Sequence, residues 1–306
     1  MKNTTEQAVK VYYWTGVLLV LVASFCFAIK GVFIKIAYQH GADTITILAL
    51  RMIFSMPFFA FVAIQLALKN GGLNVSRRQW AWVLGLGITG YYGASFLDFE
   101  SLNYISAALE RILLFVYPTF VLFINAIFRK KPVTKLQWFA LMLTYSGIFL
   151  AFIENIDSAQ QKNIMLGAFW VISSGLVYAI YLVGNDKIIP QIGAEKFTAL
   201  AMLAATLPTV LHCFALNQLK IWHHDKVVYQ IGFLLATVAT VFPTFVISEG
   251  IKRIGSSNTS IVASIGPVFT IILATTILDE VITPIQIFGT ALVLLGVFLI
   301  GWRGKR

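Results

Sequence analysis

Charged residues are scarce in this chain of 306 residues. Asp, Glu, Lys and Arg make up 12% of it, while 58% of the residues are hydrophobic. A soluble domain carries roughly 25% charged residues, so this chain has about half the usual fraction available for a solvent-exposed surface. The composition therefore excludes an ordinary soluble domain, and it favours a chain whose apolar surface faces a lipid bilayer.

Cysteine and histidine are also rare. Cys26 and Cys213 both lie in apolar runs, and neither has a Cys or His partner at the spacing of a metal site. We interpret them as small buried hydrophobic residues. His223 and His224 are adjacent, whereas a metal-binding helix would place two histidines four positions apart. We expect no metal and no cofactor. Because no Ser/His/Asp or Cys/His set has a useful spacing, we also expect no catalytic residues and no enzyme.

Two familiar phosphate-binding motifs do not fit. Gly85, Gly87 and Gly90 spell G-x-G-x-x-G, but they lie inside an apolar stretch rather than between a strand and a helix. Close packing of helices through small residues explains them better. The sequence contains no P-loop, so it gives no support to direct drive by ATP.

Long apolar runs fill the chain instead. A spanning helix needs about 20 mostly apolar residues, and the first run, Val11 to Phe33, is too long for the core of a signal peptide. The sequence predicts an all-α membrane protein of ten spanning helices, as follows: Trp14–Tyr38, Asp43–Leu68, Gln79–Leu97, Ile105–Phe128, Leu136–Ile153, Ile164–Val183, Glu195–Leu216, Tyr229–Gly250, Ser256–Leu278 and Pro284–Trp302.

Basic residues in the predicted loops indicate the orientation. With the N-terminus in the cytoplasm, sixteen Lys and Arg residues fall on that side. The opposite side has four, namely Lys35, Lys162, Lys220 and Lys226, and it also receives the acidic pairs Asp98/Glu100 and Asp279/Glu280. This bias predicts a multi-pass protein of the cell (inner) membrane with both termini in the cytoplasm. It also explains the net charge of +10 without a nucleic-acid partner.

The two halves of the chain are similar to each other. Residues 100–150 align with 249–299 without gaps, so that Pro118 meets Pro267 and Gly147 meets Gly296. Further upstream the offset grows by two, and Gly16 meets Gly167. We therefore predict two repeats, residues 14–153 and 164–302. Because each has five helices, the second is inverted, and such repeats support alternating access around a central cavity.

Pro118 and Pro267 fall inside the fourth and ninth predicted helices. A proline frees a backbone carbonyl there, and such helix breaks tend to line a cavity. A simple packing kink is the other interpretation.

At this level of detail the sequence resembles an EamA-type member of the drug/metabolite transporter superfamily. The resemblance rests on "ISAALERILLFVYPTFVLFINAIFRKKPVTKLQWFALMLTYSGIFL" and "IGSSNTSIVASIGPVFTIILATTILDEVITPIQIFGTALVLLGVFLIG", at equivalent places in the two halves. It covers about residues 14 to 302. It implies ten helices, cytoplasmic termini and a central cavity, in a family of mostly exporters of small metabolites with some importers. Leu109–Arg111 carries more charge than is common at this place in the family.

Among the charged residues inside the predicted spans, the candidates for a functional role are Lys30, Arg51, Glu110 and Arg111. Counting residues from the helix ends places all of them roughly 8–13 Å below the outer surface. One hypothesis is that they line the pathway, select a substrate with a carboxylate or phosphate, and couple transport to protons through Glu110. The other is a structural ion-pair network in which Lys30 extends towards the surface.

Aromatic residues with polar atoms also lie inside the spans. They could bind an amphipathic metabolite, or they could be ordinary packing. The members are Tyr91, Tyr92, Tyr117, Tyr178, Tyr181 and Trp170.

These observations favour a secondary transporter, most simply an exporter of a small polar or amphipathic metabolite such as an amino acid or another carboxylate. An importer of the same fold and a non-transporting membrane receptor are the alternatives. An intramembrane enzyme would need a catalytic dyad or metal cluster, which the sequence does not offer. The sequence leaves the substrate and the oligomeric state open.

Overall fold

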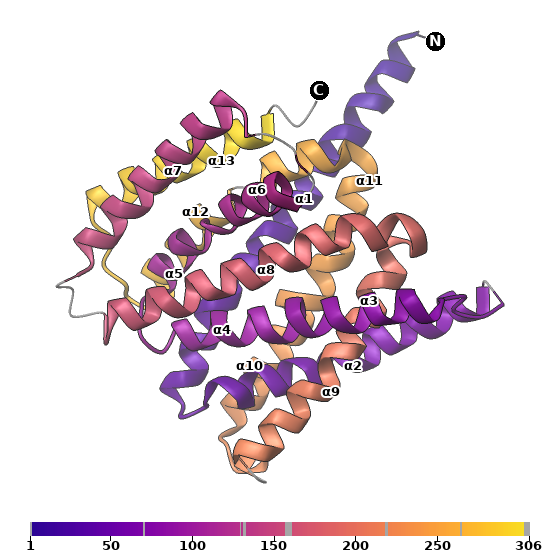
Figure 1. The fold of residues 1–306 in the computed structure, drawn as a ribbon, viewed down its shortest axis with the longest axis horizontal. Helices are drawn as coiled ribbons and strands as arrows, with labels where there is room; N and C mark the ends of the chain where they lie inside the picture. Colours follow the sequence, from indigo (N-terminus) through magenta and orange to yellow (C-terminus); the bar gives the residue numbers. More distant parts are fainter. Residues whose placement is uncertain are drawn as a thin grey trace.

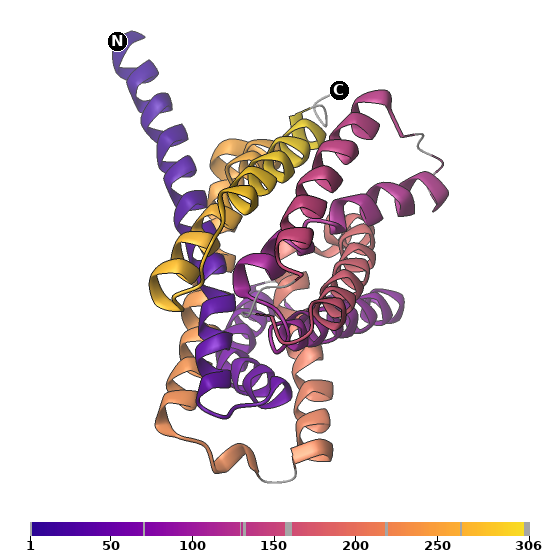
Figure 2. The ribbon, with the colours of Figure 1, turned by 90° about the vertical axis from the view of Figure 1, so that its left-hand side faces the viewer.

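The computed structural model describes residues 2–69, 71–128, 130, 133–156, 161–217, 220–263 and 265–302. Every regular element in these ranges is a helix, and no strand occurs in them. Several basic residues used for the orientation, namely Arg129, Lys131, Arg303, Lys305 and Arg306, lie outside the described ranges. Both views show tilted helices that form one bundle, with the start of the first helix and the end of the last towards the same end (Figures 1 and 2).

Over the described ranges, seven stretches of helix are long and apolar enough to cross a membrane, as expected of a multi-pass membrane protein. Five are formed by single helices: α1 (Lys2–Gln39), α2 (Thr44–Lys69), α7 (Lys135–Glu154), α8 (Ile164–Ile192) and α9 (Ala194–Asn217). The others are Ala107–Phe128 and Lys226–Gly255, each built from several shorter helices. The 3₁₀ turn η2 (Lys220–Trp222) follows α9.

The first helix is longer than the sequence predicted. It begins at Lys2 rather than Trp14, and its apolar span starts at Val11. No proline or glycine occurs before Gly16, so the sequence contains no helix-breaking residue that would delay the start of the helix to Trp14. The first turns project from the bundle in both views, and Val11 and Trp14 are exposed (Figure 2).

Two predicted spans contain a π-helical segment at equivalent positions. The third consists of α3 (Arg77–Gly87), the π-helix η1 (Ile88–Ala94) and α4 (Ser95–Ser101), so it continues past the expected end at Leu97. The eighth consists of α10 (Lys226–Ala236), the π-helix η3 (Thr237–Val241) and the start of α11 (Phe242–Ala263). Both π-helices begin eleven residues after their helix starts, and such segments are frequent at functional sites.

The prolines of the repeat sit at helix breaks. The fourth predicted helix is divided into α5 (Ala107–Leu114) and α6 (Tyr117–Phe128), and Pro118 is the second residue of α6. Pro267 is likewise the second residue of α12 (Gly266–Ile277), which follows α11. A proline is tolerated in a first turn because the missing N–H has no partner there. Both prolines therefore lie in the first turn of a helix, and the fourth predicted span is divided just before Pro118.

Glycine allows the other change of direction. α11 contains Gly255 with φ of 78° and ψ of 156°, a conformation that other residues rarely adopt. The break lies between the predicted eighth and ninth spans. The last helix, α13 (Pro284–Trp302), begins with the same capping pattern as α7. In both, the threonine before the helix and a glutamine in its first turn each accept a hydrogen bond from the other's backbone N–H. The pairs are Thr134 with Gln137 at α7 and Thr283 with Gln286 at α13.

The helices pack closely through small residues. α7 and α13 lie side by side (Figure 1). A Cβ on Gly147 would collide with the carbonyl oxygen of Gly289, and one on Gly296 would collide with that of Ala140. Gly289 follows Ala140 by the same 149 positions that separate Gly296 from Gly147. The same kind of contact is therefore made twice, once from each helix.

The G-x-G-x-x-G stretch serves helix packing at two of its three glycines. A Cβ on Gly87 would meet the backbone of Ala201 in α9, and one on Gly90 would collide with the ring of Tyr181 in α8. Gly85 has nothing within 4 Å of such a Cβ. The interpretation as packing residues is thus confirmed for Gly87 and Gly90 but not for Gly85.

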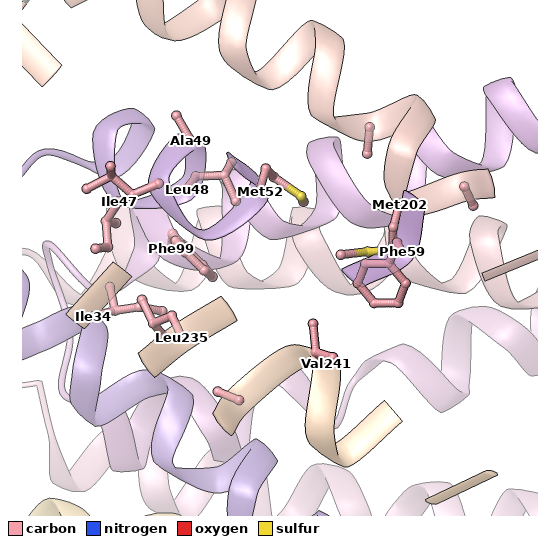
Figure 3. Close-up of a cluster of buried hydrophobic side chains, with 14 of the residues drawn as sticks. Ile34, Ile47, Leu48, Ala49, Met52, Phe59, Phe99, Met202, Leu235 and Val241 are labelled. Atoms are coloured by element: carbon pink, nitrogen blue, oxygen red, sulfur yellow. The ribbon is translucent and has the colours of Figure 1, made fainter. Parts of the chain in front are cut away.

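A continuous apolar core joins α1, α2, α4, α9 and α10 (Figure 3). Ile34, Met52, Phe99, Met202 and Leu235 are almost fully buried in it. Cys26 and Cys213 are buried free thiols, as expected for small hydrophobic residues. This core extends along α2 from Ile45 to Ala63, and its member Tyr181 also lines the cavity described next.

Candidate functional site

A cavity of about 530 Å³ lies between the helices. Pockets of roughly 300–1,000 Å³ are typical of small-molecule sites. Its charged lining residues are Lys30 from α1, Arg51 from α2, Asp98 from α4 and Arg111 from α5. The structure therefore places three of the four predicted charged residues at one cavity, together with an aspartate that the sequence reasoning did not select.

Lys30 is anchored by Asp98. Its Nζ lies 2.6 Å from Oδ2 of Asp98, and the two side chains are 19% and 5% exposed. Nζ also lies 5.7 Å from the centre of the Phe99 ring. Lys30 therefore points to a carboxylate within the protein rather than extending to the surface as one interpretation had it.

Asp98 was predicted to lie in an outer loop, and this is wrong. No helix-breaking residue occurs between Leu97 and Ser101, so α4 continues for one more turn and carries Asp98 into the bundle. The side chain is 3% exposed. The absence of a helix-breaking residue was the signal that could have found it.

The hydrogen bonds of Arg51 to α4 and η1 come from its Nη2 atom. Its Nη2 donates to the backbone oxygen of Tyr91 at 3.3 Å and to Oγ of Ser95 at 3.1 Å. Its guanidinium carbon lies 5.0 Å from the centre of the Phe99 ring. Within the described ranges, Nε of Arg51 is buried without a hydrogen-bond partner.

Arg111 has more unpaired hydrogen-bond donors than Arg51. Its Nε and Nη2 are both buried and, among the residues that the structure describes, have no hydrogen-bond partner. Arg111 belongs to the cavity lining, whereas its neighbour Glu110 does not. Glu110 is 0% exposed behind the wall. Consecutive residues on a helix point about 100° apart, which explains why only one of the two reaches the cavity.

Tyrosines form the wall that comes from α8, α6 and η1. Tyr178 and Tyr181 are stacked, with ring centres 5.8 Å apart, and Tyr117 meets Tyr178 edge-on at 5.3 Å. The hydroxyl of Tyr181 donates to that of Tyr91 at 3.0 Å. Four of the five predicted tyrosines, all except Tyr92, line the cavity.

The remaining predicted residues have other surroundings. Trp170 is absent from the lining; its ring packs on Phe169, and its Nε1 has no partner among the described residues. Tyr92 bonds Nδ1 of His212 at 2.8 Å, away from the cavity. Pro267 is part of the lining but Pro118 is not.

Equivalent positions of the two halves both contribute to the lining of the cavity. Lining residues occur in pairs that are 149 or 151 positions apart: Phe27 and Tyr178, Lys30 and Tyr181, Gly90 and Ala239, Tyr91 and Thr240, Ser95 and Thr244, Asp98 and Ile247, Leu114 and Ala263, and Tyr117 and Gly266. Within these pairs, the charged members come from the first half. The first half thus supplies the charged lining residues, and the lining residues of the second half are uncharged.

Comparison with known proteins decides the family. The model of the EamA-like transporter family matches residues 14–153 and, separately, residues 165–302. The chain belongs to the EamA-like transporter family. The "Uncharacterized transporter YcbK" of Bacillus subtilis (strain 168) is 32% identical to this EamA-like chain over 292 residues, covering 93% of the chain and 91% of the relative. An uncharacterized transporter of Synechocystis sp. is 26% identical and covers 94% and 93%.

A solved structure also matches the EamA-like chain over almost its whole length. The structure, titled "Crystal structure of protein", has a TM-score of 0.58 and 16% identity, and the match covers 98% of this chain and 99% of that one. At this identity the match shows the fold alone. Together with the apolar helices, the family makes this EamA-like protein a multi-pass membrane transporter with a small-molecule substrate. Over the described ranges, no three His, Cys, Asp or Glu side chains gather as metal ligands would.

Proposed function

We propose that this protein is a secondary transporter that exports a small amphipathic metabolite bearing a carboxylate. The observation that carries the proposal is the pair of arginines at the cavity, Arg51 and Arg111. Nε of Arg51, and Nε and Nη2 of Arg111, are buried and have no hydrogen-bond partner among the described residues. A buried guanidinium N–H without an acceptor costs free energy. An anionic ligand would supply acceptors to both side chains.

The chemistry of the wall narrows the substrate class. A guanidinium binds a carboxylate through two parallel hydrogen bonds, which are short and charge-assisted. Tyr117, Tyr178 and Tyr181 line the same cavity as the arginines and contribute aromatic ring surface to it. The cavity therefore suits a molecule with a carboxylate at one end and an apolar or aromatic body at the other.

Alternating access is supported by the internal similarity of the halves. The paired lining positions, the two π-helices and the equivalent glycine contacts of α7 and α13 fit two five-helix repeats of opposite orientation around the cavity. In such transporters the halves exchange conformations and expose one central site to each side in turn. Three spans then join the seven long ones: α3 to α4, the end of α11 with α12, and α13.

We place both termini in the cytoplasm, as the distribution of basic residues indicates. The ends of α1 and α4 and the start of α5 then lie on the outer side. Export as the direction is supported by the resemblance to a family of mostly exporters.

Comparative metabolomics of cells and medium tests the proposal. The wild type is expected to accumulate one class of carboxylate in the medium, and Arg111→Gln is expected to lose this accumulation at equal abundance in the membrane. Arg78→Gln is the matched control, because Arg78 is an exposed arginine at the start of α3. Accumulation that survives in Arg111→Gln contradicts the binding role. Depletion of the metabolite from the medium by the wild type would show import instead.

A further inference from the structure

Glu110 is a buried carboxyl group without a donor. Its side chain is 0% exposed, and neither of its oxygens has a hydrogen-bond partner over the described part of the chain. Oε2 lies 3.9 Å from the position of a Cβ built on Gly31 of α1, so the neighbouring helix packs against it. An isolated buried carboxylate is very costly. Glu110 therefore needs either a cation in contact or a proton.

Asp98 is the group that faces Glu110. The two carboxyl groups lie within hydrogen-bonding range of each other. Two ionised carboxylates have no donor between them. Oδ1 of Asp98 and both oxygens of Glu110 consequently have no hydrogen-bond partner among the described residues. A single proton would turn this repulsive contact into a hydrogen bond.

Among the described residues, no nearby cation bonds the oxygens that this proton would join. Lys30 of α1 bonds the other oxygen of Asp98, Oδ2. Arg51 of α2 acts on Asp98 from a distance but bonds Tyr91 and Ser95. Arg111 of α5 also acts on both carboxyl groups, yet over the described ranges it makes no salt bridge with either. One bonded cation thus faces two carboxyl groups.

The other elements around the pair add no bonded charge. The phenols of Tyr38 in α1 and Tyr178 in α8 lie within electrostatic range of Asp98. α12 has no ionisable side chain, and the charged residues of α7 are at its two ends, Lys135 and Glu154. The Lys30–Asp98 ion pair fixes the negative charge on Asp98, so the proton belongs on Glu110.

We propose that Asp98 and Glu110 form a proton-binding site in which protonated Glu110 donates a hydrogen bond to Oδ1 of Asp98. Asp98 lines the cavity and Glu110 lies behind it, so a proton from water reaches Glu110 past Asp98. No covalent bond other than O–H forms or breaks. The site is confined to the first half, because its equivalents are Ile247 and Thr259.

The site has a consequence for transport, which rests on the proposed function. Binding of the proton adds one positive charge beside Arg111. An anion in the cavity therefore binds more tightly when the pair is protonated, and by linkage the anion favours the protonated pair. The proton and an anionic substrate are expected to occupy the protein together.

Infrared spectroscopy of the purified protein in lipid tests the site without a substrate. The wild type is expected to show the C=O stretch of a protonated carboxyl group at neutral pH. Glu110→Gln should remove this band, and Asp98→Asn should shift its frequency because the acceptor changes. Glu100→Gln is the matched control and should leave the band unchanged, because Thr44, Asn103 and Tyr104 already donate to that carboxylate.

Carboxyl-¹³C glutamate introduced by cell-free synthesis gives a second measurement that needs no substitution. It should shift the band of the wild type, whereas labelled aspartate should not. Absence of the band in the wild type, its persistence in Glu110→Gln, or a shift with labelled aspartate alone would each overturn the proposal. A negative result with intact carboxylate export would remove the proton site and leave the proposed function standing.

Discussion

The carboxylate of Glu280 accepts a hydrogen bond from the backbone N–H of Ala107 at 2.8 Å, although 173 residues separate the two in the chain. Its other oxygen accepts from the N–H of Ala108 at 3.1 Å. Glu280 follows α12, and Ala107 begins α5, the helix that carries Glu110 and Arg111. Free N–H groups and the helix dipole make this end of α5 favourable for a carboxylate. Glu280 therefore ties the candidate site to the second half of the chain.

Replacing Glu280 by Gln should destabilise the protein. The charge at the helix end is lost, and we expect a decrease of about 1–2 kcal/mol in the free energy of unfolding. Thermal unfolding of the purified protein in detergent measures the change. Glu249→Gln is the control, since Glu249 is 43% exposed in its contact with Arg253. Equal shifts in the two variants would argue against a special role of Glu280.

Lys30→Met should lower the free energy of unfolding more than a double substitution that removes both charges of the Lys30–Asp98 ion pair. The single substitution leaves Asp98 buried beside Glu110 without its cation, at a cost of roughly 3–5 kcal/mol. The double variant Lys30→Met/Asp98→Asn removes both charges and should recover most of this stability. A thermal double-mutant cycle measures the coupling. Lys252→Met, in an exposed pair with Glu195, should change stability by about 0–1 kcal/mol.

Gly87→Ala and Gly85→Ala form a matched pair within one helix. A Cβ on Gly87 would lie 2.5 Å from the carbonyl oxygen of Ala201, so α3 and α9 would have to move apart. We expect a loss of roughly 1–3 kcal/mol for this variant. Gly85→Ala should be neutral or slightly stabilising, because its Cβ meets open space and alanine favours a helix. The order of the two unfolding temperatures checks the prediction, and a reversed order contradicts it.

The tyrosine wall should determine affinity for the body of the substrate. Tyr178 stacks on Tyr181 and lines the cavity, so Tyr178→Ala is expected to raise the KM for export roughly tenfold. Trp170→Phe should leave KM unchanged, because Trp170 does not contribute to the lining. Initial rates of efflux at several substrate concentrations measure both values. An unchanged KM in Tyr178→Ala would place the substrate elsewhere.

Transport should depend on pH through Asp98 and Glu110. The protonated pair favours an anionic substrate, so affinity is highest at low pH and falls as rising pH removes the shared proton. Glu110→Gln keeps the neutral state at every pH, and its affinity should be constant over this range. Binding measured across pH in both proteins tests the difference. Parallel curves would show that another group titrates.

Much of the architecture follows from the sequence. Apolar runs of spanning length predicted helical membrane segments, because only lipid can accept so much apolar surface. The match of Pro118 with Pro267 and of Gly147 with Gly296 also indicated equivalent places in two halves. The structure gives these residues equivalent roles in helix starts and in the α7–α13 contact.

The sequence also identified Lys30, Arg51, Glu110 and Arg111, because charges are costly inside apolar helices wherever they point. What it could not determine is the partner of each charge, since a partner comes from another helix and depends on helix ends and rotation. One extra turn of α4 brings Asp98 to Lys30 and Glu110, and a rotation of about 100° separates Arg111 in the cavity from Glu110 behind it. Only the tertiary structure decided that two carboxyl groups meet there beside Lys30, because the meeting depends on how α4 and α5 turn towards each other and on how the distant α1 packs against them.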